Sequence, residues 1–171
     1  KQKNIRMLPV SVNFSRIHLH EESFPKKLFD LTQKYGLSPE NFEIELTESF
    51  FDSDTKVTKK TVKKLQDYGF SVAIDDFGSG YSALNMLKDF DFDTLKIDTK
   101  FLEGFEHGGK VGTVVTSVIR MAKWLGIPVV AEGVESKEQK DCLKEMHCDM
   151  IQGFYYSKPL KQEDFIEKLR A

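Results

Sequence analysis

Cysteine is scarce in this sequence, and its scarcity excludes several kinds of site. Only Cys142 and Cys148 occur among 171 residues, and their spacing matches neither a zinc knuckle nor a disulfide framework. Few cysteines are typical of proteins in a reducing compartment.

The sequence also lacks an apolar run near the roughly 18 residues of a membrane span, and residues 1–7 are polar, with no signal core behind them. We predict a cytoplasmic domain without direct membrane contact, although a parent protein could carry a membrane anchor elsewhere.

An excess of charge of one sign is absent as well. The chain has 25 basic and 27 acidic residues, which gives a formal net charge of -2. This balance argues against binding of a nucleic-acid polymer or of a membrane surface through overall charge. An anionic ligand would have to be held locally, by metal ions or by a few basic side chains. The length predicts one domain, residues 1–171.

Short β-branched runs alternate with longer amphipathic segments along the chain. The segments repeat apolar side chains at helical spacing, and Gly36, Gly69 and Gly126 follow three of them, where a left-handed cap favours glycine. A capping box is predicted at residues 136–139, and a mobile loop at residues 103–112. The predicted strands are residues 8–12, 42–46, 70–74, 94–97, 128–131 and 150–153. This repeated strand–helix order predicts parallel βαβ units in a doubly wound sheet or a barrel.

Each predicted strand carries a polar group with ligand or acid–base chemistry near its C-terminal end. These groups are Asn13, Glu45 with Glu48, Asp75 with Asp76, Lys96 with Asp98, Glu132 with Glu135, and Gln152. In a parallel barrel such ends converge on the face that carries active sites.

Several carboxylates cannot share one partly dry site unless protons, bases or cations neutralise them. Lys96 is the only base on a predicted strand, so it cannot balance five or more acids. Carboxylate and amide oxygens suit Mg²⁺ or Mn²⁺, and the lack of a histidine at any strand end argues against zinc. The histidines, which are His18, His20, His107 and His147, are predicted to be solvated. Two neighbouring metal ions can clamp the oxygens of a phosphodiester displacement, with one carboxylate of the Asp75–Asp76 pair as a bridge.

The sequence resembles the EAL family, the bacterial cyclic di-GMP phosphodiesterases. The matching stretches keep the family order and span nearly the whole chain: residues 10–15, 45–49, 73–82, 95–98, 130–135 and 152–160. The most specific of them is Asp-Asp-Phe-Gly-Ser-Gly-Tyr-Ser, residues 75–82. The resemblance implies an α/β fold of the TIM-like (β/α) barrel type, and hydrolysis of one phosphodiester bond of cyclic di-GMP by metal-activated water to give linear pGpG.

The resemblance also implies a role for each polar residue. Asn13, Glu45, Asp75, Asp76 and Glu132 would bind the two metal ions, which are Mg²⁺ or Mn²⁺. Lys96 would hold the attacking water with Asp98 beside it, and Glu132 would share in catalysis. Substrate binding or support of the glycine loop would fall to Glu48, Glu135, Gln152 and Pro159. Structural alternatives stay open for three of these: Glu48 as a turn cap, Glu135 as the start of a helix, and Gln152 as a core amide.

The Glu-Ala-Leu tripeptide that names the family does not occur in these residues. A barrel of this type has about 250 residues, so we expect an incomplete barrel with about six strands, lacking the first strands and helices and with open edges that invite a homodimer. A sensor or cyclase-like domain is expected upstream in the parent protein. The alternatives to an enzyme are a sensor that binds cyclic di-GMP without cutting it, and an interaction module without nucleotide function.

Overall fold

The computed structural model describes residues 7–15, 21–52, 55–78, 83–98 and 109–169. His18, His20, His107, loop residues 79–82 and residues 103–108 of the predicted mobile loop lie outside this part. The described strands form one six-stranded parallel sheet in chain order. They are β1 (Val10–Phe14), β2 (Phe42–Thr47), β3 (Ser71–Phe77), β4 (Thr94–Ile97), β5 (Val129–Ala131) and β6 (Met150–Ile151). All six predicted strands are therefore confirmed, with small differences at their ends.

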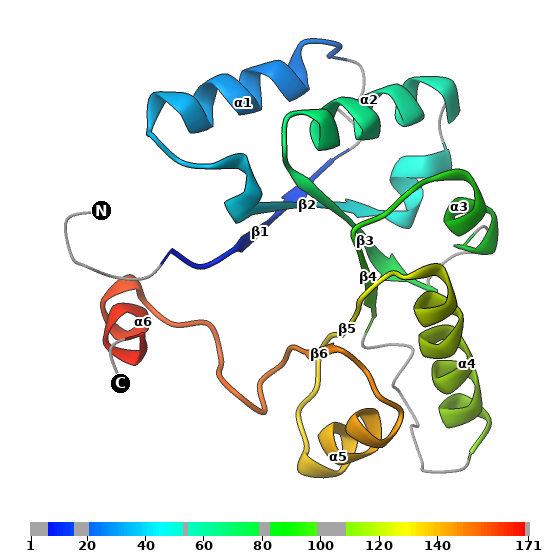
Figure 1. Cartoon of the computed structure of the whole chain (residues 1–171). Helices are drawn as coiled ribbons and strands as arrows, with labels where there is room; N and C mark the ends of the chain where they lie inside the picture. The colour runs from blue at the N-terminus through cyan, green and yellow to red at the C-terminus, as the bar shows by residue number, and fades with distance from the viewer. Residues whose placement is uncertain (1–6, 16–20, 53–54, 79–82, 99–108, 170–171) are drawn as a thin grey trace.

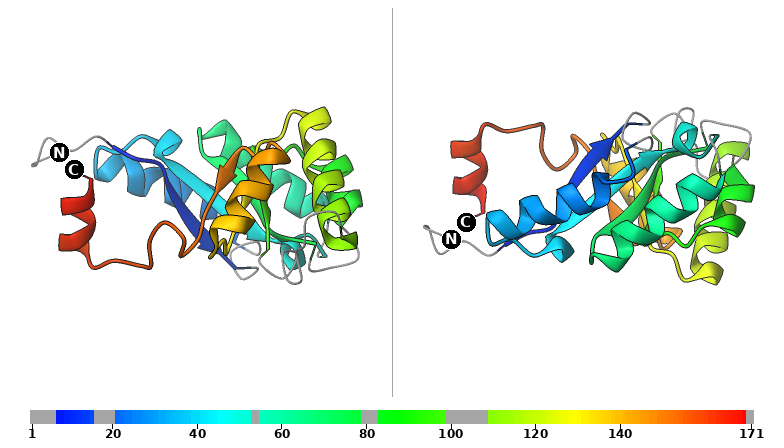
Figure 2. Two further views of the ribbon diagram at one scale, coloured as in Figure 1. Left: turned by 90° about the horizontal axis from the view of Figure 1, so that it is seen from below. Right: turned by 90° about the horizontal axis from the view of Figure 1, so that it is seen from above.

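Helices follow the strands and cover the outer side of the curved sheet (Figure 1). They are α1 (Phe24–Lys34), α2 (Thr55–Asp67), α3 (Ala83–Asp89), α4 (Lys110–Leu125), α5 (Lys137–Glu145) and α6 (Gln162–Lys168), with 3-10 turns η2 (Pro39–Asn41) and η3 (Glu48–Asp52). The first turn of α4 takes up the last residues of the predicted mobile loop, so the loop prediction is wrong there. Figures 1 and 2 show that α6 stands apart from the sheet, on the side where the chain enters β1.

The two faces of the sheet differ in chemistry because side chains alternate along each strand. On the outer face, apolar side chains pack against the helices and are almost fully buried: Ile44, Leu46, Val72, Ile74, Leu95, Ile97, Val129 and Ala131. The alternate positions, which include Glu43, Glu45, Asp75 and Lys96, turn to the inner face. Parallel strands buried on both faces are usually apolar throughout, so this polar inner face marks a site rather than a second core.

The helix ends agree with the sequence prediction. Gly36, Gly69 and Gly126 have φ values of 61°, 91° and 75°, the left-handed conformation that glycine adopts at little cost. Ser136 and Gln139 form the predicted capping box, in which each side chain accepts a backbone N–H of the other residue.

Most apolar side chains that recur at helical spacing do pack in or against the core, among them Phe24, Leu28, Val62, Leu65, Val118 and Ala122, but some do not. On α4, Val114 and Leu125 are 48% and 53% exposed, whereas Val115 and Ile119 are fully buried. Leu31 and Tyr35 at the end of α1 are also exposed, and Thr32 between them is buried. The helical period therefore identifies each helix and most of its buried face, but not every residue of that face.

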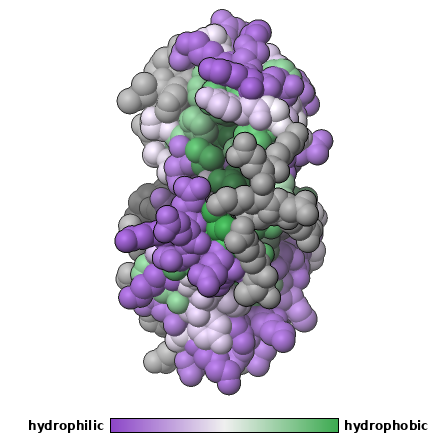
Figure 3. Space-filling view, turned by 90° about the vertical axis from the view of Figure 1, so that its left-hand side faces the viewer, coloured by the Kyte–Doolittle hydropathy of each residue, from purple (hydrophilic) through white to green (hydrophobic). Residues whose placement is uncertain are grey.

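The inner face is open between the two edge strands, β1 and β6. A cavity of about 700 Å³ lies there, lined among others by Ser11, Glu43, Lys96, Met150 and Gln152. Seen from the left of Figure 1, apolar residues gather in a hollow between two hydrophilic regions (Figure 3). Among the helices of the described residues, none combines the length and the apolar character needed to cross a membrane.

Candidate metal centre

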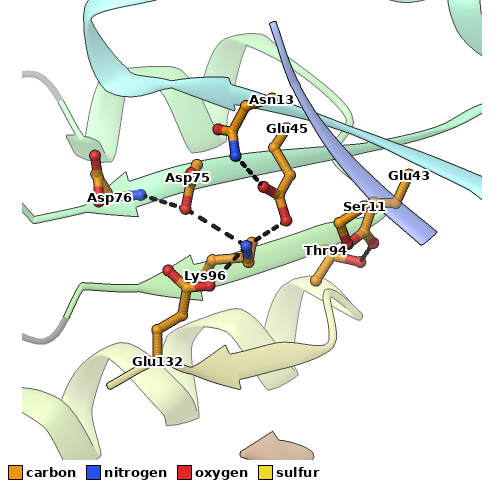
Figure 4. A network of polar contacts seen from close by, with 9 residues as sticks. All are labelled: Ser11, Asn13, Glu43, Glu45, Asp75, Asp76, Thr94, Lys96 and Glu132. Carbon is orange, nitrogen blue, oxygen red and sulfur yellow. Dashed lines mark hydrogen bonds and ion pairs between the residues drawn. The ribbon is translucent and has the colours of Figure 1, made fainter. Parts of the chain in front are cut away.

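Polar side chains from β1 to β4, and from Glu132 directly after β5, meet on the inner face around the ammonium group of Lys96 (Figure 4). Lys96 Nζ donates to a carboxylate oxygen of Glu45 and lies 2.6 Å from Glu132 Oε1 and 3.7 Å from Asp75 Oδ1. Asn13 Nδ2 donates to the other oxygen of Glu45 at 2.9 Å. Lys96 and Glu45 are each 4% exposed. The structure therefore brings these five predicted site residues into one connected network.

Asp75 and Asp76 both reach the same site, although neighbours in a regular strand point to opposite faces. The pairing of β3 with β4 shifts between Ile74 and Phe77, which is a bulge. Asp76 has a φ of 55°, a left-handed value that is uncommon for any residue but glycine. Its backbone N–H donates to Asp75 Oδ1 at 3.0 Å. Bulges of this kind redirect side chains beside active sites.

Because of this bulge, carboxylate oxygens of Asp75, Asp76 and Glu132 lie within 4.8 Å of one another. Asp75 is buried and the other two are half-buried. Oxygen donors without sulfur or imidazole suit a hard divalent cation such as Mg²⁺ or Mn²⁺. These side chains therefore fit the divalent cation that the sequence implies. Glu45, which Lys96 contacts, and Asn13, which donates to Glu45, offer further oxygen atoms nearby.

The charges of the site do not cancel, and this shows in two pKa values. Burial opposes the charge of Lys96, but hydrogen bonds to Glu132 and Glu45 and attraction to Asp75 outweigh it, so the pKa of Lys96 lies above its ordinary value. Burial raises the pKa of Glu132; Lys96 counteracts this, whereas repulsion from Asp75 and Glu45 adds to it, and the net direction is upward. The single positive charge of Lys96 thus cannot neutralise the carboxylates of Glu45, Asp75 and Glu132 together.

A second row of side chains lies two residues earlier on the same strands (Figure 4). Ser11 Oγ donates to Glu43 Oε1 at 3.0 Å, and Thr94 Oγ1 donates to Glu43 Oε2 at 2.6 Å. We call Asn13, Glu45 and Lys96, together with the Asp75 and Glu132 carboxylates that Lys96 contacts, the upper row. We call Ser11, Glu43 and Thr94 the lower row. Sequence reasoning missed the lower row, although the alternation Glu43–Ile44–Glu45 on one strand was a usable signal.

The remaining predicted site residues lie around this network. Glu48 is buried at the start of η3. Asp98 follows β4 directly and is half-buried, whereas Glu135, Gln152 and Pro159 are exposed. Gln152 is exposed in this chain and lines the open cavity, which does not agree with the core-amide alternative. The Glu135 N–H donates to Gln139 Oε1 at 2.9 Å, which agrees with the alternative that Glu135 helps to begin α5.

Close backbone contact positions Gln152. The Val134 N–H donates to the Gln152 carbonyl at 3.0 Å, and the Tyr155 N–H donates to the Val134 carbonyl at 3.0 Å. A Cβ atom at Gly153 would lie 2.1 Å from the Val134 carbonyl oxygen. Only glycine permits this approach, so Gly153 fixes the segment after β6 against the segment that carries Glu132 and Glu135.

Comparison with known proteins places these features in a family. A family model described as EAL domain matches residues 1–159. Signaling protein YkoW of Bacillus subtilis is 37% identical over 158 residues, which are 92% of this chain and 20% of that protein. Probable cyclic di-GMP phosphodiesterase PdeB of Escherichia coli is 36% identical over 157 residues, 92% of this chain and 30% of that protein. The chain thus spans about a fifth to a third of the length of these relatives.

Solved structures share the fold. The EAL domain of Mycobacterium smegmatis DcpA has a TM-score of 0.89 and 34% identity, and the match covers 95% of this chain and 73% of that chain. Klebsiella pneumoniae BlrP1, in a complex with manganese and cyclic di-GMP, has a TM-score of 0.83 and 34% identity over 88% of this chain and 39% of that chain. EAL domains are TIM-like barrels, so the fold prediction is confirmed.

Proposed function

This chain belongs to the EAL domain family, and on that premise we propose that it carries the metal and water-binding part of a cyclic di-GMP phosphodiesterase. The reaction would break one of the two phosphodiester bonds of the cyclic dinucleotide and give linear pGpG. One observation carries the proposal: three carboxylates converge within 4.8 Å beside a buried lysine on the inner face of the sheet. Such a set can hold divalent cations and a water molecule together.

Asp75, Asp76 and Glu132 would hold one divalent cation, and Glu45 with Asn13 would supply oxygen ligands on the other side of Lys96. Bound Mg²⁺ or Mn²⁺ would lower the pKa of a water molecule and stabilise negative charge on the phosphate oxygens. The structure of the similar protein BlrP1 in a complex with manganese and cyclic di-GMP supports the use of a divalent cation.

Lys96 would act as a hydrogen-bond donor rather than as a base. Its raised pKa keeps the Nζ atom protonated at neutral pH, so the ammonium can hold an oxygen nucleophile but cannot accept its proton. A carboxylate of the site would take that proton, and Glu132, which lies 2.6 Å from Lys96 Nζ, is positioned to do so. Asp98 beside β4 would support Lys96.

The outer parts of the site would serve the substrate. Gln152 lines the cavity of about 700 Å³ and could contact a base or ribose. Glu135 and Pro159 would help to bind the substrate or to support its pocket, and Glu48 would support the segment after Asp76. A homodimer and a separate sensor or cyclase-like domain in the parent protein complete the proposal.

The test is hydrolysis of cyclic di-GMP followed by liquid chromatography, with Mn²⁺, with Mg²⁺ and with a chelator. It should be run on this chain and on the parent protein that contains it. We expect pGpG only with a divalent cation, and loss of product in the Asp75→Asn variant of the parent protein. Tight cyclic di-GMP binding without product in the parent protein would instead favour the sensor alternative. Absence of both binding and turnover would favour an interaction module.

A further inference from the structure

The lower row repeats the arrangement of the upper row on the same three strands. In each row a donor on β1 and a donor on β4 share one glutamate of β2. Ser11 pairs with Glu43 and Asn13 with Glu45 in the strand register. Each glutamate reaches across β3 to β4, where the small side chain of Ala73 leaves room on the inner face.

The lower row has hydrogen bonds but no metal-ligand geometry. Among the described residues, the Glu43 carboxylate meets two hydroxyl donors, and no ammonium group lies within ion-pair distance. Both of its oxygens are used, one for each neighbouring strand. A carboxylate with two such contacts fixes the relative positions of β1, β2 and β4 at one level of the sheet.

We propose that Glu43 is a positioning residue for the site above it. By joining Ser11 and Thr94, it holds β1 and β4 at the separation at which Glu45 can accept from both Asn13 and Lys96. The inference rests on the proposed function only for its effect on catalysis, because the placement of Lys96 can be measured without metal or substrate.

Lysine reactivity tests the placement directly. The chain is treated with N-hydroxysuccinimidyl acetate without metal, and the labelling rate of each lysine is read by mass spectrometry. Lys96 is buried and bonded to carboxylates, so it should react slowly in the unaltered chain. In Glu43→Ala we expect Lys96 to react about tenfold faster, as loss of a hydrogen-bonded constraint implies. The exposed Lys88 and Lys123 serve as internal references.

Two variants separate position from charge and from general instability. Glu43→Gln can still accept from Thr94 through its oxygen and donate to the Ser11 hydroxyl through its nitrogen, so we expect a Lys96 rate near that of the unaltered chain. Val115→Ala creates a cavity at a fully buried position of α4, away from both rows. It lowers stability without changing the lower row, so the Lys96 rate should stay low.

Catalysis in the parent protein provides the second readout. We expect Glu43→Ala to lower kcat about tenfold with little change of KM, and Glu43→Gln to restore most of it. The proposal is overturned if Lys96 labelling is unchanged in Glu43→Ala, if Val115→Ala accelerates it equally, or if the glutamine variant behaves like the alanine variant. If the unaltered parent protein neither binds Mn²⁺ nor hydrolyses cyclic di-GMP, the proposed function fails, and the labelling result still decides the role of Glu43.

Discussion

The upper and lower rows share strands and the same glutamate geometry, yet they differ in how their carboxylates are satisfied. In the lower row, two neutral hydroxyl groups satisfy Glu43. In the upper row, a buried ammonium joins Glu45 to Asp75 and Glu132, and burial with mutual repulsion raises the pKa of Glu132. The difference shows that the sheet supplies position to both rows, whereas several carboxylates around one buried ammonium, which protons or cations can neutralise, distinguish the upper row.

The largest expected difference between the rows follows from replacing the β4 donor of each. Lys96→Met would leave the upper-row carboxylates without their buried cationic partner. We therefore expect the free energy of unfolding, measured without metal, to fall by about 3–5 kcal/mol. Thr94→Val removes one neutral donor from Glu43 and should cost about 1–3 kcal/mol. Urea denaturation with a chelator present measures both.

Addition of Mn²⁺ sharpens this test. A cation can replace the lost positive charge, so Mn²⁺ should stabilise Lys96→Met more than it stabilises the Thr94→Val variant. Equal losses of stability in the two variants, or an equal response to Mn²⁺, would mean that the rows do not differ in charge in the way the structure indicates.

The next expected effect concerns the glutamates. Glu45→Gln removes a proposed anionic ligand and a hydrogen-bond partner of Lys96, so Mn²⁺ affinity should fall by roughly 10–100-fold. The same substitution at Glu43 keeps two hydrogen-bonding atoms and should change the affinity much less. Isothermal titration of MnCl₂ into both variants measures the difference, and a reversed order would contradict the proposed ligand set.

The sequence predicted more of the upper row than of anything else in the site. Each strand and its C-terminal end can be located from local sequence, because a β-branched run is followed by acidic or amide residues. Five predicted residues, Asn13, Glu45, Asp75, Lys96 and Glu132, indeed meet in one network. Asp76 was also predicted at the site, and it does lie with Asp75 and Glu132. The bulge that brings it there, with a φ of 55°, was not predictable. The lower row was not predictable either, because it depends on register across three strands.

Other misses have similar physical causes. The short helix α6 lies apart from the sheet, so its sequence carries no strong apolar stripe. On α1, the buried face includes Thr32 while Leu31 is half exposed. The helical spacing of apolar residues therefore located the helices and most of their buried faces, but not every residue that packs in the core.

The pH dependence of stability tests the excess acid of the upper row. The folded-state pKa of Glu132 is raised above the ordinary value of 4.5, mainly by burial. The folded chain therefore holds a proton more tightly than the unfolded chain does. This contribution to stability is fully present below the ordinary value and is lost as the pH rises through the folded-state pKa.

We therefore expect the metal-free unfolding free energy of the unaltered chain to decrease over that range relative to the Glu132→Gln variant, which cannot titrate there. Urea denaturation of both proteins across a pH series gives the difference. If the difference in unfolding free energy between the two proteins stays constant with pH, or changes in the opposite direction, then Glu132 does not carry the excess negative charge of the upper row.

The smallest expected effects come from the β1 donors, because both Ser11 and Asn13 are exposed. Each donates one hydrogen bond to a β2 glutamate, at 3.0 Å and 2.9 Å. Ser11→Ala and Asn13→Ala should each lower stability by about 0.5–1.5 kcal/mol. Only Asn13→Ala should also weaken Mn²⁺ binding, since only Asn13 offers an amide oxygen beside the carboxylates. Thermal unfolding with and without MnCl₂ separates the two results, and equal Mn²⁺ responses in the two variants would place the metal ligands elsewhere than in the upper row.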